Sequence, residues 1–262
     1  MRTVGDSQIL DALTQAVSGG GPIVLATIID TEGSVPRHAG TKMVVNADGS
    51  SIGTIGGGRV EAAIREDALG VLASRRPATH EYVLHDPAQG DPGVCGGTMR
   101  VYLEPYMAPH TIYVIGAGHV GRAVVDLAHW LGYRTVVVDD RKDLASEEAM
   151  PNADERFEGT VEDALVALPV LEDTAVVVVT RSHELDARIM PLLLGTPARY
   201  VGVMGSRRRW EATREQLGDA GISAEAMDRI HNPIGADIAA ETVEEIAVSI
   251  MSEVIAAMNG DS

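Results

Sequence analysis

The segment TIYVIGAGHVG, residues 111–121, decides the fold class of the second half of the chain. Its first five residues form a short, largely apolar run, which is typical of a strand buried on both faces. Gly116, Gly118 and Gly121 follow in the spacing G-x-G-x-x-G, and a helical pattern begins directly after them. Such glycines permit a tight turn and close backbone approach, and a helix N-terminus favours a pyrophosphate. The segment therefore predicts a Rossmann-type strand, turn and helix, with His119 inside the turn.

Three further apolar runs extend this pattern on the C-terminal side. They cover residues 135–138, 175–179 and 200–203, and helical stretches separate them. Short apolar strands that alternate with helices predict a parallel sheet covered by helices on both faces. The last helical pattern begins at a capping box formed by Thr242 and Glu245,.

Two polar residues after the second strand of this pattern bear on the ligand. Asp139 ends that strand, where the Rossmann fingerprint has an acidic side chain that accepts a hydrogen bond from the ribose 2′-hydroxyl of NAD,. Arg141 follows two residues later, so an NADP-type ligand remains an alternative to NAD,. The alternative is that the glycine turn serves only helix–strand packing and binds no dinucleotide.

The first half of the chain has a different pattern, with glycine-rich turns between β-prone runs. Its predicted elements are a helix over 9–17, strands over 23–29, 42–46 and 50–55, a helix over 59–73, and strands over 81–84 and 98–103,. The stretch from Pro105 to Pro109 is interpreted as a linker. The fold class expected is α/β, with a glycine-rich α+β domain over residues 1–106 and a Rossmann-like domain with a parallel sheet over residues 110–262.

Glycine density in the first half indicates backbone that is close to a ligand or at positive φ. The candidate residues are Gly33, Ser34 and Arg37, with Gly56, Gly57 and Gly58. Exposed N–H groups beside an arginine could cradle an anion, and the alternative is turn chemistry without a ligand.

Two further segments contain candidate binding residues. Cys95 stands among glycines, which suits either a reactive thiol or an inert small side chain,. Ser206 and Arg207 open the run SRRR just past the strand over 200–203, where ligand loops of a parallel sheet lie,. Three consecutive arginines favour an anion site, and the alternative is a solvated helical turn.

Composition and charge exclude several classes of function. The net charge of −17 and an aromatic content of 3% argue against binding to nucleic acid or to an anionic membrane,. A single cysteine excludes an internal disulfide and a cysteine-rich zinc site, and the histidines lack metal-ligand spacing,. We therefore expect no metal site. Because the sequence has no apolar run of membrane length and no signal peptide, we expect a cytoplasmic protein.

Several longer strings of the chain together resemble the XdhC/CoxI family, the xanthine dehydrogenase accessory proteins. These strings are LATIIDTEGSVPRHAGTKMVV, GTIGGGRVEAAI, CGGTMRVYLEP, YVIGAGHVGRA, VVVDDR, VGVMGSRRR and HNPIGADIAAETVEEIAVSIMSE. They occur in the family's order and cover nearly the whole chain. The family pattern includes Gly33, Arg37, Gly56, Gly57, Gly58, Cys95 and Arg207. Ala236 and Val243 depart from it, at positions expected to affect packing.

The resemblance implies a chaperone for the molybdenum cofactor, molybdopterin. Such a protein binds the pterin cofactor, supports its sulfuration and helps to insert it into a molybdenum hydroxylase of the xanthine dehydrogenase type. A cysteine desulfurase and a second copy of the chain, in a homodimer, are the further partners implied.

The rival hypothesis is an NAD(P)-dependent oxidoreductase that uses the Rossmann-like domain. Hydride transfer needs a placed acid or base, and only His119 and His183 are candidates for that role,. Neither has an evident partner in the sequence. We therefore assign no catalytic residue, and the sequence favours an accessory protein over an enzyme.

Overall fold

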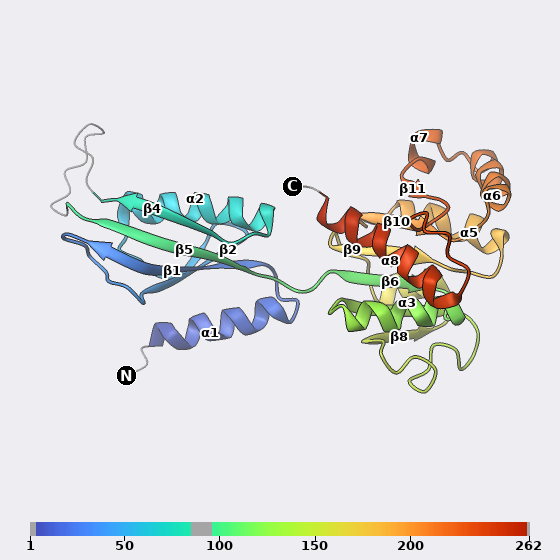
Figure 1. Cartoon of the computed structure of the whole chain (residues 1–262), viewed down its shortest axis with the longest axis horizontal. Coiled ribbons are helices and arrows are strands. Elements are labelled where there is room, and N and C mark those ends of the chain that lie inside the picture. The colour runs from blue at the N-terminus through green and yellow to red at the C-terminus, as the bar shows by residue number, and fades with distance from the viewer. Residues whose placement is uncertain (1–3, 85–95, 261–262) are drawn as a thin grey trace. The chain divides into compact units, whose positions relative to one another are not determined.

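The computed structural model describes residues 4–84 and 96–260 (Figure 1). The chain divides into two compact units, Met1–Ala108 and Pro109–Ser262. None of the helices within these two described ranges has both the length and the apolarity that crossing a bilayer requires.

The first unit is built on a five-stranded antiparallel sheet in the order β3-β2-β1-β5-β4. The strands are β1 (Ile23–Glu32), β2 (Lys42–Asn46), β3 (Ser51–Gly53), β4 (Ala78–Val83) and β5 (Thr98–Tyr106). Alternate residues of β1 face opposite sides, because successive side chains of a strand point to opposite faces. Val24 and Ala26 pack toward α2 (Gly58–Ser74), whereas Ile23 and Leu25 pack toward α1 (Val4–Val17).

Several boundaries in this unit differ from those predicted. Strand β1 continues past residue 29 to Glu32, β4 begins at Ala78, and β3 ends at Gly53 because the chain turns there toward Glu61. Pro105 lies inside β5, although we interpreted it as part of a linker. Beyond Leu103 no β4 partner pairs with β5 in the described sheet, so a missing N–H is tolerated on that edge,.

The second unit has a six-stranded parallel sheet in the order β11-β10-β9-β6-β7-β8. Its strands are β6 (Thr111–Ile115), β7 (Arg134–Asp139), β8 (Glu155–Glu158), β9 (Thr174–Val178), β10 (Tyr200–Val203) and β11 (Ile230–His231). The four strands predicted from apolar runs are confirmed as the central ones. The two edge strands, β8 and β11, were not predicted, because the first has the polar sequence ERFE and the second spans two residues.

Helices cover both faces of this parallel sheet. They are α3 (His119–Trp130), α4 (Val161–Ala167), α5 (His183–Leu194), α6 (Arg207–Asp219), α7 (Ala224–Met227) and α8 (Val243–Asn259). One apolar core joins α3 and α8 to the sheet, and a second joins α4, α5 and α6 to the opposite face. The capping box at Thr242 is confirmed at the start of α8. The predicted α/β class with a Rossmann-like sheet is confirmed.

Strand order places a topological switch at the centre of the sheet. From β6 the chain continues to β7 and β8 on one side, and then returns to β9 on the other side of β6. Ligands of such sheets bind outside the carboxyl ends of the strands at the switch. The ends of β6, β7 and β9 are therefore where a ligand site is expected.

A buried ion pair fixes the backbone beyond β9. Asp186 of α5 is fully buried, and its carboxylate accepts bonds from Arg209 Nε at 3.0 Å and Nη2 at 2.6 Å. Thr180 Oγ1 donates to the same carboxylate, and Arg209 Nη2 also donates to the Thr180 carbonyl at 3.3 Å. The network joins the end of β9 to two helices, α5 and α6.

We expect Asp186→Ala to lower the free energy of unfolding by about 3–5 kcal/mol, because it leaves the Arg209 guanidinium without its counterion. Urea unfolding followed by fluorescence measures this, since Trp210 is buried next to Arg209. The control is Asp219→Ala at the exposed end of α6, which should change stability by less than about 0.5 kcal/mol. Similar losses in the two variants would contradict the assigned role.

Candidate functional site

The glycine turn between β6 and α3 is confirmed, and its three glycines have different roles. A Cβ on Gly116 would lie 2.6 Å from the Val179 carbonyl oxygen, and a Cβ on Gly121 would overlap the carbonyl oxygen of Gly116. These two glycines are required by the fold itself. A Cβ on Gly118 would have only Arg141 Nη2 within 4 Å, at 3.9 Å, so this glycine borders open space.

Asp139 ends β7 as predicted, but its carboxylate is already bound to protein donors. Its Oδ2 accepts the Ala117 N–H at 2.7 Å, and the Arg141 guanidinium donates to both oxygens at 2.8 and 2.7 Å. The Arg141 N–H donates to Oδ1 at 2.9 Å. Burial raises the pKa of Asp139, but the hydrogen bonds from Arg141 and Ala117 outweigh burial and hold this pKa below its usual value.

In this arrangement, the Asp139 carboxylate is therefore not open to the expected hydrogen bond from a ribose hydroxyl. The side chain is 3% exposed, and Arg141 covers it. A ribose hydroxyl can reach the carboxylate only after the Arg141 guanidinium moves away. Arg141, with a side chain that is 42% exposed, is the member of the pair that a ligand can contact.

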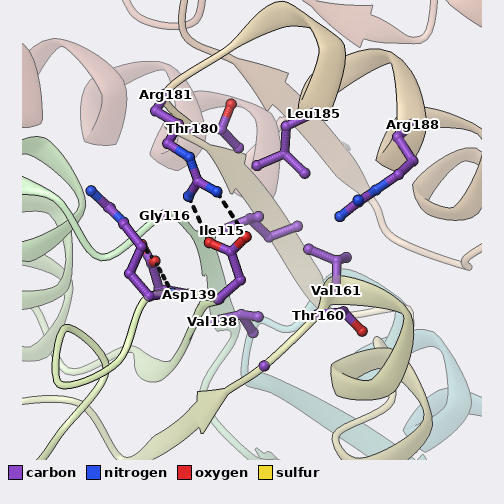
Figure 2. A pocket seen from close by; sticks show the side chains of 13 residues that line it. Ile115, Gly116, Val138, Asp139, Thr160, Val161, Thr180, Arg181, Leu185 and Arg188 are labelled. Atoms are coloured by element: carbon purple, nitrogen blue, oxygen red, sulfur yellow. Dashed lines mark hydrogen bonds and ion pairs between the residues drawn. The ribbon is translucent and has the colours of Figure 1, made fainter.

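A small pocket, with a cavity volume of about 20 Å³, lies at the carboxyl ends of β6, β7 and β9. Ile115, Val161 and Leu185 point into it from three different elements and form an apolar wall (Figure 2). Arg181 and Arg188 extend toward the same space from the loop after β9 and from α5 (Figure 2). The convergent cations beside this apolar wall suit an anionic group at the pocket.

Several candidate residues lie away from this pocket. His119 begins α3 and lines a separate hollow between α3 and α8. Ser206 caps α6 by accepting the Arg209 N–H, so its hydroxyl serves the helix. Arg207 is exposed, and the described part of the chain gives it no ion-pair partner. The His183 ring has one ion-pair partner among the described residues, its neighbour Glu184.

Sequence reasoning missed Arg181 and Asp140, which bridge the ends of β9 and β7. A signal was present, because Arg181 comes three residues after β9, much as Arg141 comes two residues after β7. It also missed that Arg209, and not Arg207, is the arginine of the SRRR run that packs into the fold. Within the described ranges, no cluster of three or more His, Cys, Asp or Glu side chains could hold a metal ion.

In the first unit, three glycine segments from distant parts of the sequence lie together at one end of the sheet. A Cβ on Gly33 would lie 3.1 Å from the Cα of Gly97, and one on Gly97 would lie 2.5 Å from the Glu32 carbonyl oxygen. A Cβ on Gly56 would lie 2.8 Å from Cγ of Pro36. We call Gly33–Arg37, Gly56–Gly58 and Gly96–Gly97 the glycine cluster. Cys95 lies outside the described residues.

Glu61 of α2 holds one segment of this cluster. It is buried, and its Oε2 accepts from Thr54 Oγ1 at 2.7 Å and from the Gly57 N–H at 3.1 Å. Arg65 Nη2 donates to Oε1 at 2.6 Å. Burial raises the pKa of Glu61, but the hydrogen bonds from Thr54, Gly57 and Arg65 outweigh it and lower the pKa.

The open side of the glycine cluster presents backbone and one cation. Gly57 and Gly58 have φ of 78° and 65°, and no atom outside their immediate neighbours lies within 4 Å of a Cβ built on either. Ser34 and Arg37 are exposed, and no described side chain pairs with the Arg37 guanidinium. Within the described part of the chain, the cluster therefore offers N–H groups and the Arg37 guanidinium to an anion.

Comparison with known proteins identifies the family. Residues 16–83 match the family described as XdhC and CoxI, and residues 112–254 match the XdhC Rossmann domain. The chain belongs to the XdhC and CoxI family. The resemblance drawn from the sequence strings is thereby confirmed.

Two relatives in Escherichia coli strain K12 and one solved structure are similar to this chain over most of its length. The uncharacterised protein YqeB is 34% identical over 91% of this chain and 44% of its own length, so this chain spans less than half of YqeB. PaoD, named a molybdenum cofactor insertion chaperone, is 25% identical over 94% of this chain and 86% of its own. A crystal structure titled xanthine dehydrogenase, from Bacillus halodurans, has the same fold, with a TM-score of 0.54, 24% identity and coverage of 97% and 96%.

Gly118 and Gly121 of the XdhC Rossmann domain make a matched pair for substitution. We expect Gly121→Ala to destabilise the chain by about 2–4 kcal/mol, because its Cβ would overlap the Gly116 carbonyl,. Gly118→Ala should change stability by less than about 1 kcal/mol, because its Cβ would border open space,. Urea unfolding measures both effects. Equal stability losses in the two alanine variants would contradict the distinction.

The pH dependence of stability tests the role of Glu61. Because its folded pKa lies below the unfolded value of 4.5, its stabilisation is present above that pH and is lost as pH falls through the folded pKa,. We expect Glu61→Gln to lose about 1–3 kcal/mol at neutral pH and to show a shallower decline toward acid. Urea unfolding between neutral and acid pH measures this. The control is Glu66→Gln on the exposed face of α2, whose pH profile should match the unsubstituted chain.

Proposed function

We propose that this chain binds the molybdenum cofactor and delivers it to a molybdenum hydroxylase of the xanthine dehydrogenase type. The observation that carries the proposal is the glycine cluster, in which three segments far apart in the sequence present open backbone and an arginine that pairs with no described side chain. Membership of the XdhC and CoxI family supports it. The similarity to PaoD, which is named a molybdenum cofactor insertion chaperone, supports it further.

The chemistry of the glycine cluster fits the anionic end of a pterin cofactor. Molybdopterin carries a phosphate, which needs N–H donors and a cation. Gly57 is the N-cap of α2, a helix of 17 residues that has no side-chain cap, so N–H groups of its first turn remain available,. The Arg37 guanidinium can add a bidentate, charge-assisted contact. In a chain with a net charge of −17, these local donors must hold the anion,.

Cys95 is assigned to the end of the cofactor opposite the phosphate. That end would carry the molybdenum and its soft sulfur ligands, which the recipient enzyme needs. A thiolate is the protein group that suits a soft metal–sulfur centre. Cys95 directly precedes Gly96 of the glycine cluster in the sequence. We include in the proposal that a cysteine desulfurase provides the sulfur and that the chain acts as a homodimer in the cytoplasm. The Rossmann turn and Arg141 are assigned to a nucleotide ligand, with NAD as one candidate.

Reconstitution tests the delivery function. A xanthine dehydrogenase-type enzyme made without this protein should be folded but inactive, and cofactor-loaded protein should restore its activity. Arg37→Ala should lower cofactor affinity by about tenfold to a hundredfold, because a charge-assisted hydrogen bond contributes about 1.5–3 kcal/mol. The matched control is Arg229→Ala, which removes an exposed arginine from the second unit.

The same assay separates delivery from the rival function. The protein alone should form no NADH from purines or simple alcohols with NAD. Substrate-dependent NADH production by the purified, molybdenum-free protein would overturn the delivery function in favour of an oxidoreductase. Cys95→Ala should bind cofactor yet fail to restore the recipient enzyme, and full restoration by this variant would remove the thiol from the proposal.

A further inference from the structure

The hollow between α3 and α8 lies on the face of the parallel sheet that these two helices cover, and its cavity volume is about 490 Å³. The two helices lie side by side, and the N-terminal half of each lines the hollow (Figure 1). Its apolar lining consists of Ala123 and Leu127 of α3 and of Val243, Ala247 and Val248 of α8. We call this hollow the α3–α8 groove.

Apolar side chains continue along both helices beyond the groove. Trp130 is 79% exposed and follows Ala123 by seven residues and Leu127 by three, so it lies on the same side of α3,. On α8, Val248 is 47% exposed, and the half-buried Ile255 follows it by seven residues. The outward stripe of a surface helix is normally polar, so this face has the composition of a surface that another element covers.

Helix α8 has few charged side chains that could keep it solvated. Between Ile246 and Asn259 the sequence contains a single charged residue, Glu253. Its carboxylate is bonded to His231 Nδ1 at 2.8 Å and to the Gly235 N–H, so it serves the loop after β11. A helix that is apolar on nearly all sides is usually buried, and the side of α8 at the groove is not,.

The dimensions of this surface fit one further helix. Helix α3 has 12 residues and is therefore about 18 Å long, since each residue adds about 1.5 Å,. An additional helix can place its own row of side chains in the groove between two neighbouring helices. Such an amphipathic helix, three to four turns long, would cover Trp130, and tryptophan is among the residues that contribute most to binding at protein interfaces.

The charged residues at the groove favour a basic partner. Arg122 Nε lies 3.8 Å from Asp126 Oδ2, and Asp126 also accepts a hydrogen bond from Asn152 Nδ2 at 3.0 Å. Glu244 is exposed, and no described side chain pairs with it. The whole chain has a net charge of −17, and its apolar helices α1 and α8 contain no lysine or arginine. A helix with a cation complements Glu244, whereas these helices of a second copy do not.

We propose that the α3–α8 groove binds an amphipathic helix of another protein, with its apolar stripe between α3 and α8 and a lysine or arginine opposite Glu244. This is the helix-in-groove mode of recognition, in which affinity comes from apolar anchors spaced three or four residues apart. The proposal is independent of cofactor delivery, because no residue of the glycine cluster takes part. Its test uses the full chain without cofactor, so either conclusion can fail while the other stands.

The probe is a synthetic peptide of about 14 leucine and lysine residues, in which the leucines recur every three or four positions. A comparison peptide has the same composition with strictly alternating leucine and lysine, so it has no apolar helical face. Neither peptide contains tryptophan, and the chain has an exposed one, Trp130, and a buried one, Trp210. We expect the helical peptide to shift the tryptophan emission to shorter wavelength, and Trp130→Phe to lose this shift.

Two substitutions at the groove have matched controls. Val248→Lys should lower the affinity for the helical peptide by at least about tenfold, because it places a charge among apolar groups. Its control is Val166→Lys, the same change at an 85% exposed position of α4 on the opposite face, which should leave the affinity unchanged.

Glu244→Gln should lower the affinity by about two- to fivefold, as expected for loss of an exposed ion pair. Its control is Glu215→Gln on the exposed side of α6, which makes the same change in net charge and should have no effect. Titration calorimetry measures all four affinities, and thermal unfolding confirms that each variant is folded.

The proposal is overturned if the helical peptide does not bind, or if the alternating peptide binds as tightly, because net charge alone would then explain the attraction. Equal affinities of Val248→Lys and Val166→Lys would also overturn it, and an unchanged affinity in Glu244→Gln would overturn the cation contact. Light scattering tests the other occupant. If Val248→Lys dissociates a dimer of the chain, a second copy covers the groove and the proposal fails.

Discussion

The geometry of the second unit depends on the buried carboxylate of Asp139. It joins the end of β7 to the glycine turn after β6 through the Ala117 N–H, and it fixes Arg141 through both oxygens. A carboxylate that is 3% exposed is stable only because four donors replace the water that it loses,. The same bonds orient Arg141 beside the open space at Gly118. The carboxylate that the Rossmann fingerprint assigns to a ribose contact is thus bound to protein donors, and Arg141 is the exposed member of the pair.

The first unit contains a similar buried carboxylate, formed by other residues. There a glycine turn also precedes a helix, and the buried Glu61 accepts a backbone N–H from the turn, a Thr54 hydroxyl and an Arg65 guanidinium. In both units, a buried acid holds glycine-rich backbone at the start of a helix. Flexible glycine turns lose much conformational freedom when they are ordered, so a charged anchor is needed to keep them in one conformation.

The central strands of the parallel sheet could be predicted from sequence because each is buried on both faces and so is apolar throughout. The edge strand β8 could not, since its exposed positions carry the polar sequence ERFE. For the site, the spacing of residues 116–141 placed Asp139 at a strand end correctly. The Arg141 guanidinium occupies both oxygens of the Asp139 carboxylate. This contact depends on side-chain packing, which the spacing of residues along the sequence does not encode. Likewise, only the orientation of α6 decides that Arg209 faces α5 while Arg207 faces solvent.

The chain has 38 acidic against 21 basic side chains, and this imbalance explains why the three arginines of the pocket are all paired. Arg141, Arg181 and Arg188 each face a carboxylate, at Asp139, Asp140 and Glu162. An anion that bound to these arginines would have to displace a carboxylate, so its affinity would be the difference between its own contacts and those of the displaced acid. Each acid also fixes the orientation of its arginine, because a paired guanidinium keeps one direction whereas an unpaired side chain samples many rotamers.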